Sequence, residues 1–471
     1  MPTQKSRRLP PLSGVLVLVM ASTGLVVVDL TIVAIGLPLI SAELAHGASA
    51  ESVVVTYMVA MGALTQVVGS LSDRWGRRPL FLAGIAVFTM ASLAATVAPS
   101  LLWLDVARVV QGAGAAGIMV NAIPLLSDRY TGEERNLAIG AWGSFATAAG
   151  LLAPTLGGVL ADAFGWRAVF AVNLPLGVAA WVLAARVLPR SPVAPGAGRP
   201  DWLGGLLLML GLGMATLLML RPDDARWSGQ DTAVLCTACL TLAVFLAVQL
   251  RVPVPTLELR MFGRPAFSGA MLAVFLSRVL TIGGSVYLVL YFSDGLGVSP
   301  TAAGLLMTPI FLAQIAMGIV GSKLLSHWAP GLVIGSGYAL KGAGLAALAL
   351  LITPDTPWWA LLLPLLAWGA GGGVAGAPVM AVAVRVTAPE RVGMVAGTVA
   401  TLASLGAGVG TAALGAVFTR HGGHDSQAVT DGARAVLGVS AALAVVAVLT
   451  TVALIDPRRI PRPDRDRTPA S

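Results

Sequence analysis

Long runs of apolar residues, separated by short polar segments, fill most of the chain. A membrane-crossing helix needs about 20 apolar residues, and backbone groups in hydrocarbon find partners only within helices or closed barrels. Because the apolar runs have this length, they predict an all-α polytopic membrane protein whose helices form one bundle. The fourteen expected spans are 13–36, 52–72, 79–98, 101–126, 136–160, 166–188, 202–220, 232–250, 266–292, 300–322, 331–352, 358–384, 393–419 and 434–455.

The composition agrees with a chain embedded in lipid. Of its 471 residues, 56% are hydrophobic and 11% are charged, whereas a soluble domain carries about 25% charged residues. A water-soluble fold this poor in charge would not cover its surface. The 55 Gly and 29 Pro fit a membrane bundle, because small residues let helices approach closely and both residue types are tolerated within spans.

The positions of Lys and Arg predict the orientation. With the N-terminus in the cytoplasm, 22 of the 30 basic residues fall on the inner side, five fall on the outer side and three fall within spans. Basic residues concentrate on the cytoplasmic side of membrane proteins, so we expect both termini inside the cell membrane and an even number of spans, twelve or fourteen. The same distribution accounts for most of the net charge of +8 without a nucleic-acid partner.

The two ends of the chain resemble each other. Residues 111–140 have a distant echo in residues 368–397, with Gly112 matching Gly369 at the same offset. A duplication of six-helix halves is typical of transporters. The predicted organisation is an N-terminal six-helix bundle at 1–190, a linker with two additional spans at 191–264, a C-terminal six-helix bundle at 265–457 and a basic cytoplasmic tail at 458–471.

The sequence GSLSDRWGRRPLF lies at the inner end of the second predicted span. A carboxylate next to three arginines can form an ion-pair cluster that latches one half against the other and breaks when the protein switches. A positively charged topological anchor is the alternative, but the ordered spacing disfavours it. We expect a cytoplasmic gate formed by Gly69, Asp73, Arg74, Gly76, Arg77 and Arg78.

This segment resembles the signature loop of the major facilitator superfamily. VVVDLTIVAIGLPLI, residues 26–40, resembles the first-helix motif of the fourteen-span drug:proton antiporters of that superfamily. LLWLDVARVVQGAGAAG, residues 101–117, resembles the fourth-helix motif linked to proton coupling. GLLAPTLGGVL, residues 150–160, resembles the fifth-helix antiporter motif, with Ala153 where that family usually has Gly. Together with the span count, the resemblance covers nearly the whole chain.

The resemblance implies an exporter of drugs or antibiotics that works by alternating access. It further implies that inward proton flow supplies the energy, so that protons and a small molecule are the partners and no other cofactor is needed. We expect a monomer in the lipid bilayer. The residues of the antiporter-motif helix are Gly150, Pro154, Gly157 and Gly158.

Charged residues inside spans are candidates for function, because charge is costly in hydrocarbon. Asp29 and Arg108 each lie about seven residues from the outer end of a span, roughly 10 Å deep at the rise of an α-helix. They can therefore pair in a central cavity, where a carboxylate can exchange a proton for a substrate. Asp105 lies one helical turn from Arg108. The resemblance favours a coupling role for Asp29, Arg108 and Gln111. A structural salt bridge for Asp29 and an inert interfacial position for Asp105 are the alternatives.

Arg278 and Lys341 lie near the middle of the ninth and eleventh spans. With Arg108 they place three bases against two acids in the membrane interior. An exporter dedicated to lipophilic cations would favour acids, so we expect a substrate that is neutral, zwitterionic or anionic. Snorkelling or pairing on a peripheral helix is the alternative for Lys341, and a structural role stays open for Arg278.

Further polar and aromatic residues within the spans are weaker candidates for lining a cavity. An aromatic residue inside a span more often packs against its neighbours than binds a ligand. These candidates are Asn121, Trp142, Phe145, Arg278, Tyr287 and Gln314.

Motifs of other function classes are missing from the sequence. It has no G-x-x-x-x-G-K-[ST] phosphate-binding loop, and its short HGGH is too little for a metal site. No long polar segment offers room for an enzyme site, so we expect no catalytic and no metal-binding residues. The alternatives are a symporter or facilitator for a small metabolite and, from another class, a membrane-embedded sensor or enzyme.

Overall fold

The computed structural model describes residues 13–45, 50–189, 201–219, 228–253, 255, 257, 259–325, 327–386, 392–423 and 425–455. The basic tail predicted at 458–471 lies outside these residues, and the side chain of Asp73 lies outside the described side chains. All regular secondary structure within the described residues is helical.

The first group of helices begins at Gly14, where the Ser13 hydroxyl accepts a hydrogen bond from the Leu16 N–H. Gly76, with φ of 94°, joins two helices in a turn that residues with a Cβ rarely adopt. The elements are α1 (Gly14–Ile40), the π-helical η1 (Ser41–Ala45), α2 (Ser52–Trp75), α3 (Arg77–Thr96), α4 (Leu101–Arg129), α5 (Gly132–Phe164), α6 (Arg167–Ala171) and α7 (Asn173–Val187).

Two helices, α8 (Trp202–Met219) and α9 (Gly229–Gln249), separate this group from a second one. In the second group, the expected span at 266–292 contains two π-helical segments, η3 and η4, that flank a short α-helix. The elements are η2 (Leu259–Gly263), α10 (Pro265–Arg278), η3 (Val279–Gly283), α11 (Gly284–Leu290), η4 (Tyr291–Gly295), α12 (Pro300–Leu324), α13 (Pro330–Leu351), α14 (Trp358–Arg385), α15 (Val392–His421) and α16 (Ser426–Leu454).

Many of these helices suit a membrane. Within the described residues, twelve helical segments are long and apolar enough to cross one. Two shorter apolar stretches, Ser52–Thr65 in α2 and Trp202–Ala215 in α8, add to them. The outward faces carry large apolar side chains such as Leu102, Leu350 and Leu363, which in water would be an aggregation hazard and in lipid are the expected surface.

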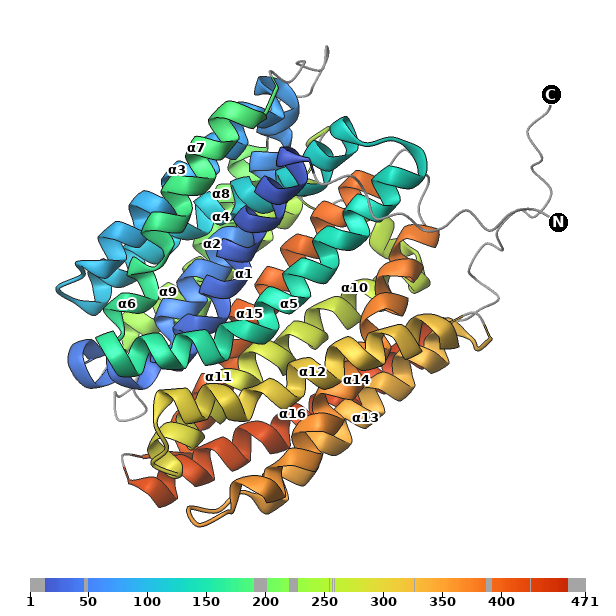
Figure 1. The fold of residues 1–471 in the computed structure, drawn as a ribbon. Coiled ribbons are helices and arrows are strands. Elements are labelled where there is room, and N and C mark those ends of the chain that lie inside the picture. Colours follow the sequence, from blue (N-terminus) through green and yellow to red (C-terminus); the bar gives the residue numbers. More distant parts are fainter. Residues whose placement is uncertain are drawn as a thin grey trace.

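The two groups of helices form two bundles that lie against each other (Figure 1). In the first bundle, α4 packs on α2 and α3, and α1 packs on α5; in the second, α14 packs on α12 and α13, and α13 packs on α16. One buried cluster of apolar residues lies mainly in the first bundle and extends into the second, and another lies mainly in the second bundle. Contacts of α5 with α12 and of α2 with α15 join the bundles, and α8 packs on α9, α2 and α15 beside this junction.

Corresponding glycines make equivalent contacts in the two bundles. A Cβ at Gly112 of α4 would press on the Tyr57 carbonyl of α2, and a Cβ at Gly369 of α14 would press on the Ile310 carbonyl of α12. The absence of side chains at these positions lets the paired backbones touch. The pairs α2–α4 and α12–α14 are therefore packed alike.

Candidate functional site

Asp29 and Arg108 form an ion pair in the interior of the first bundle. The Arg108 Nη1 donates to the Asp29 Oδ2 at 2.6 Å, and both side chains are fully buried. The Arg108 Nε donates to the Val53 carbonyl at 2.9 Å, and its guanidinium carbon lies 4.0 Å from the centre of the Tyr57 ring. The charge of Arg108 is thus shared among a carboxylate, a carbonyl and an aromatic face.

Neutral polar groups complete this network. Gln111 donates to Asp29 at 2.9 Å and to the Ser92 hydroxyl at 2.8 Å, and it accepts from Arg108 at 2.6 Å. Asn173 donates to the same Asp29 oxygen at 2.8 Å. Sequence reasoning named Asp29, Arg108 and Gln111 but missed Asn173 and Ser92. The signal for Asn173 was an amide at the start of a strongly apolar helix, α7.

A buried ion pair is most stable when its remaining donors and acceptors are also satisfied. The Arg108 Nη2 has no hydrogen-bond partner among the described residues, whereas the carboxylate has several. The Asp29 carboxylate accepts from Arg108, Gln111 and Asn173, which come from two helices other than its own. The network is nearly balanced in charge, and loss of the carboxylate charge would leave Arg108 uncompensated. The Asp29 carboxylate thus connects α1 to α4 and α7.

Asp105 lies outside this network, nearer the start of α4. Its Oδ1 accepts a hydrogen bond from the Ser52 hydroxyl at 2.9 Å, and its side chain is half-buried. Ser52 is the first residue of α2. Asp105 thus connects the adjoining ends of α2 and α4.

The motif predicted as a gate forms the turn between α2 and α3. Arg77 donates to the Asp128 carboxylate of α4 and, at 3.2 Å, to the Pro124 carbonyl. Arg78 donates to the Ala185 carbonyl at 2.8 Å. Arg74 is exposed, and Gly69 lies in α2. These partners of Arg77 and Arg78 belong to the first bundle, and sequence reasoning missed Asp128.

The glycines of the antiporter-motif helix lie at close helix contacts. A Cβ at Gly157 would stand 2.8 Å from the Ile32 Cβ of α1, and a Cβ at Gly158 would overlap the Pro300 carbonyl of α12. From the opposite side, a Cβ at Gly304 would overlap the Pro154 carbonyl. The end of α5 and the beginning of α12 therefore meet backbone to backbone. Gly150 is less crowded, with Val27 at 3.6 Å.

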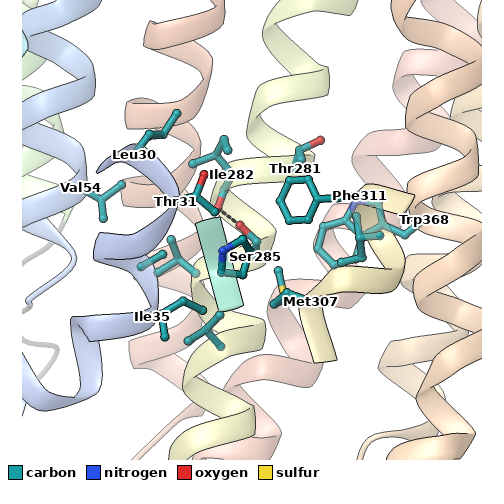
Figure 2. Close-up of a pocket in the computed structure, with 15 residues that line it drawn as sticks. Leu30, Thr31, Ile35, Val54, Thr281, Ile282, Ser285, Met307, Phe311 and Trp368 are labelled. Atoms are coloured by element: carbon teal, nitrogen blue, oxygen red, sulfur yellow. Dashed lines mark hydrogen bonds between the residues drawn. The ribbon is translucent and has the colours of Figure 1, made fainter. Parts of the chain in front are cut away.

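A small pocket, partly open to its surroundings, lies where the two bundles meet. Figure 2 shows Leu30 and Thr31 of α1 on one side and Met307, Phe311 and Trp368 of the second bundle on the other. The hydroxyls of Thr31 and Ser285 bond to carbonyls of their own helices, at 3.1 and 2.9 Å. The walls of the pocket are therefore largely apolar.

Asp29 does not line this pocket, although the next two residues of α1 do. Its side chain points into the first bundle, toward Arg108, while Leu30 and Thr31 face the second bundle. The ion pair and the pocket therefore lie on opposite faces of one helix.

The weaker candidates for lining a cavity lie outside the pocket between the bundles. Asn121 is buried between α4 and α2, where it accepts from Ser72. Trp142 donates to Thr23 at 2.8 Å, joining α5 to α1, and Phe145 of α5 is exposed. Tyr287 is buried, and its hydroxyl donates to the Thr411 carbonyl at 2.7 Å. Gln314 is half-buried on α12.

Arg278 and Lys341 come together in the second bundle. The Lys341 Nζ donates to the Thr281 hydroxyl at 2.6 Å, and Thr281 lies one turn beyond Arg278. The Lys341 side chain is 2% exposed. The Arg278 side chain is exposed, although Arg278 lies in the middle of its helical span. Among the described residues, no group of three or more His, Cys, Asp or Glu is placed to hold a metal ion.

Comparisons with known proteins agree with this architecture. A family model described as Major Facilitator Superfamily matches residues 19–287 and 270–470. The drug efflux pump JefA of Mycobacterium tuberculosis is 30% identical over 408 residues, which cover 85% of this chain and 80% of that protein. The cephamycin export protein CmcT of Amycolatopsis lactamdurans is 33% identical over 406 residues, covering 84% and 83%.

A solved structure of similar fold is a bacterial homologue of the human lysosomal transporter Spinster, in an inward-facing and unoccupied conformation. Its TM-score is 0.66 over 95% of this chain and 98% of that one, at 16% sequence identity. At this identity the likeness extends to the fold alone.

Proposed function

The chain belongs to the Major Facilitator Superfamily, and from this membership we propose that it exports small amphipathic molecules, drugs or antibiotics among them, by alternating access. The observation that carries the proposal is the largely apolar pocket enclosed between the two bundles. Relatives named as an efflux pump and an export protein support the outward direction.

We propose fourteen membrane spans with both termini in the cytoplasm of a bacterial cell. The twelve long apolar segments and the two shorter ones in α2 and α8 add up to this number. The excess of Lys and Arg on one side supports the orientation. The domain arrangement is six spans in each bundle plus α8 and α9, and the equivalent contacts of Gly112 and Gly369 support a duplication of the bundles.

In this topology the crowded contact between α5 and α12 closes the outer side of the pocket. The α2–α3 turn, with the Arg77–Asp128 ion pair, lies on the cytoplasmic side. Figure 1 shows α5 and α12 diverging away from the end where α5 ends and α12 begins. In the proposed orientation the pocket is approached from the cytoplasm, and rocking of the bundles would then expose it outside.

We propose Asp29 as the proton-carrying residue and Arg108 as the group that controls its charge. Protonation of Asp29 would weaken its bond to Arg108 and free α1 to move. Because α1 lines the pocket with Leu30 and Thr31 on its other face, the movement would alter substrate binding. Gln111 and Asn173 hold the carboxylate in place. The protein is proposed to work as a monomer, with the proton gradient as its only energy source.

Two assays in a bacterial host that lacks its own efflux pumps test the function. Cells expressing the protein are scored for growth on a panel of antibiotics and for efflux of fluorescent dyes of positive, neutral and negative charge. We expect resistance or dye efflux that a protonophore abolishes. Efflux that ignores the protonophore would contradict antiport, and inward accumulation would indicate a symporter.

A further inference from the structure

The second bundle has positive charge in its interior and no acid to balance it. Among the described residues between Pro265 and Ile455, all carboxylates lie between the helices or within the first or last two turns of a helix. Arg278 and Lys341, in contrast, lie in the middle of their spans, and the first bundle neutralises Arg108 with Asp29. The acids of this stretch are Asp294, Asp355, Glu390, Asp425 and Asp431.

Lys341 has one donor to spare for a ligand. Its Nζ bonds to the Thr281 hydroxyl at 2.6 Å and to the Ser277 carbonyl at 3.4 Å, both of which are neutral groups. An ammonium carries three donors. No carboxylate of a described residue lies within ion-pair distance of Lys341, although its side chain is only 2% exposed. A buried ammonium without a counter-charge is costly, and an anion that pairs with it recovers that cost.

Arg278 adds a second cation to the same site. It lies next to Ser277 and one turn before Thr281, the two residues that Lys341 contacts. Lys341 therefore contacts the same stretch of helix that carries Arg278. Among the described residues Arg278 has no carboxylate within ion-pair distance. Its side chain, in the middle of the span, is exposed.

This cationic site continues the pocket between the bundles. Thr281 itself lines the pocket, and so does Trp368, whose buried Nε1 has no hydrogen-bond partner. One turn beyond Trp368 is Gly372, and the point where its Cβ would stand lies 3.8 Å from the Lys341 Nζ and 3.7 Å from the Gln314 Oε1. Gln314 lies one turn beyond the pocket residues of α12. The apolar pocket thus ends in a group of polar donors from four helices.

Resting on the export function proposed above, we propose that Arg278 and Lys341 bind the negative charge of an amphipathic organic anion, such as a monocarboxylate, whose apolar body occupies the pocket. The Trp368 Nε1–H, which has no hydrogen-bond partner among the described residues, is a further donor at the pocket. A planar guanidinium binds a carboxylate through two parallel hydrogen bonds, and the apolar walls strengthen the attraction by excluding water. The substrate class is therefore narrower than amphipathic molecules in general.

Equilibrium binding of two matched probes to the purified full-length protein in detergent tests this proposal. The probes are radiolabelled 2-naphthoate, a monocarboxylate, and 2-naphthamide, its neutral counterpart. The wild-type protein is expected to prefer 2-naphthoate by about tenfold or more, the range for hydrogen bonds to charged groups. Lys341→Gln and Arg278→Gln should each lose most of this preference while binding 2-naphthamide as before, and Lys341→Arg should retain it.

Lys323→Gln is the control, because it removes a lysine charge from the exposed end of α12. Unchanged binding of 2-naphthamide shows that a variant is folded. Equal affinity of the wild type for the two probes, or equal weakening of both by Lys341→Gln, overturns the proposal. Resistance in the host without a carboxylate preference would leave the export function standing and remove the anion site. A preference for 2-naphthoate in a protein that gives neither resistance nor dye efflux would support the anion site and contradict the export function.

Discussion

At the scale of single residues, Asp29 is the side chain on which most of the first bundle's polar contacts converge. Arg108, Gln111 and Asn173 all donate to it, at 2.6 to 2.9 Å, and it has no exposure to solvent. Depth counted along two helices was enough to expect Asp29 and Arg108 at the same level. Depth does not give the rotation of a helix about its axis. Only the packed structure could therefore show that Ser92 and Asn173 belong to the network and that Asp29 points away from the pocket.

Replacement of Asp29 by Asn tests the proposed coupling. Asn keeps the size of the side chain but removes the charge, so the buried Arg108 loses its counter-ion. Breaking such a pair from one side costs about 3–5 kcal/mol. We expect Asp29→Asn to lower the melting temperature and to reduce proton-driven efflux to the level of cells without the protein, as measured by thermal unfolding and dye efflux.

The double variant Asp29→Asn with Arg108→Gln separates stability from coupling. Without the uncompensated cation, its melting temperature should recover toward that of the wild type, while efflux stays absent. Proton-driven efflux at the wild-type rate in the double variant would mean that the ion pair is structural and that the proton is carried elsewhere.

At the scale of elements, α5 connects the bundles through its glycines. Gly157 faces α1 and Gly158 faces α12, so that one turn of α5 contacts a helix of each bundle. The motif GLLAPTLGGVL indicated close packing from sequence, but the partner of Gly158 is the backbone at Pro300, far away along the chain. Gly304, which accommodates Pro154 from the other side, belongs to no motif that sequence reasoning singled out.

Alanine at Gly158 should disturb the closed contact between α5 and α12. Its Cβ would overlap backbone atoms of Pro300 and Thr301, which cannot move aside as a flexible side chain can. Overpacking of this kind costs about 1–3 kcal/mol, so we expect roughly tenfold slower dye efflux. Gly150→Ala is the control on the same helix, because its Cβ would meet Val27 at an ordinary 3.6 Å. Equal efflux by the two variants would contradict a role for the α5–α12 contact.

At the scale of the whole molecule, the proposed topology places Pro99 outside the cell and Trp328 inside it. Both are exposed and lie between helices, beyond α3 and α12 respectively. In a background in which Cys236 and Cys239 are replaced by Ala, Pro99→Cys should react with a membrane-impermeant maleimide in intact cells. Trp328→Cys should react only after the membrane is permeabilised. Labelling of both in intact cells, or the reverse pattern, would contradict the proposed orientation.

The sequence by itself determined the family and the all-helical membrane architecture. Both depend on local properties that need no partner: runs of about 20 apolar residues form helices in lipid because each backbone group bonds within its own segment. The comparisons confirm the family. The depth of each charge along its span, including Asp29, Arg108, Arg278 and Lys341, also followed from residue counting.

Only the tertiary structure decided which way these charges face and what they meet. Lipid and the protein interior are equally apolar, so a span needs no polar side that would indicate which way it faces. The rotation of each helix about its axis is therefore set by packing against other helices. That packing turned Asp29 into the first bundle and placed Leu30 and Thr31 at the pocket. It also brought Lys341 to Thr281, next to Arg278, and left the two cations without a described counter-ion.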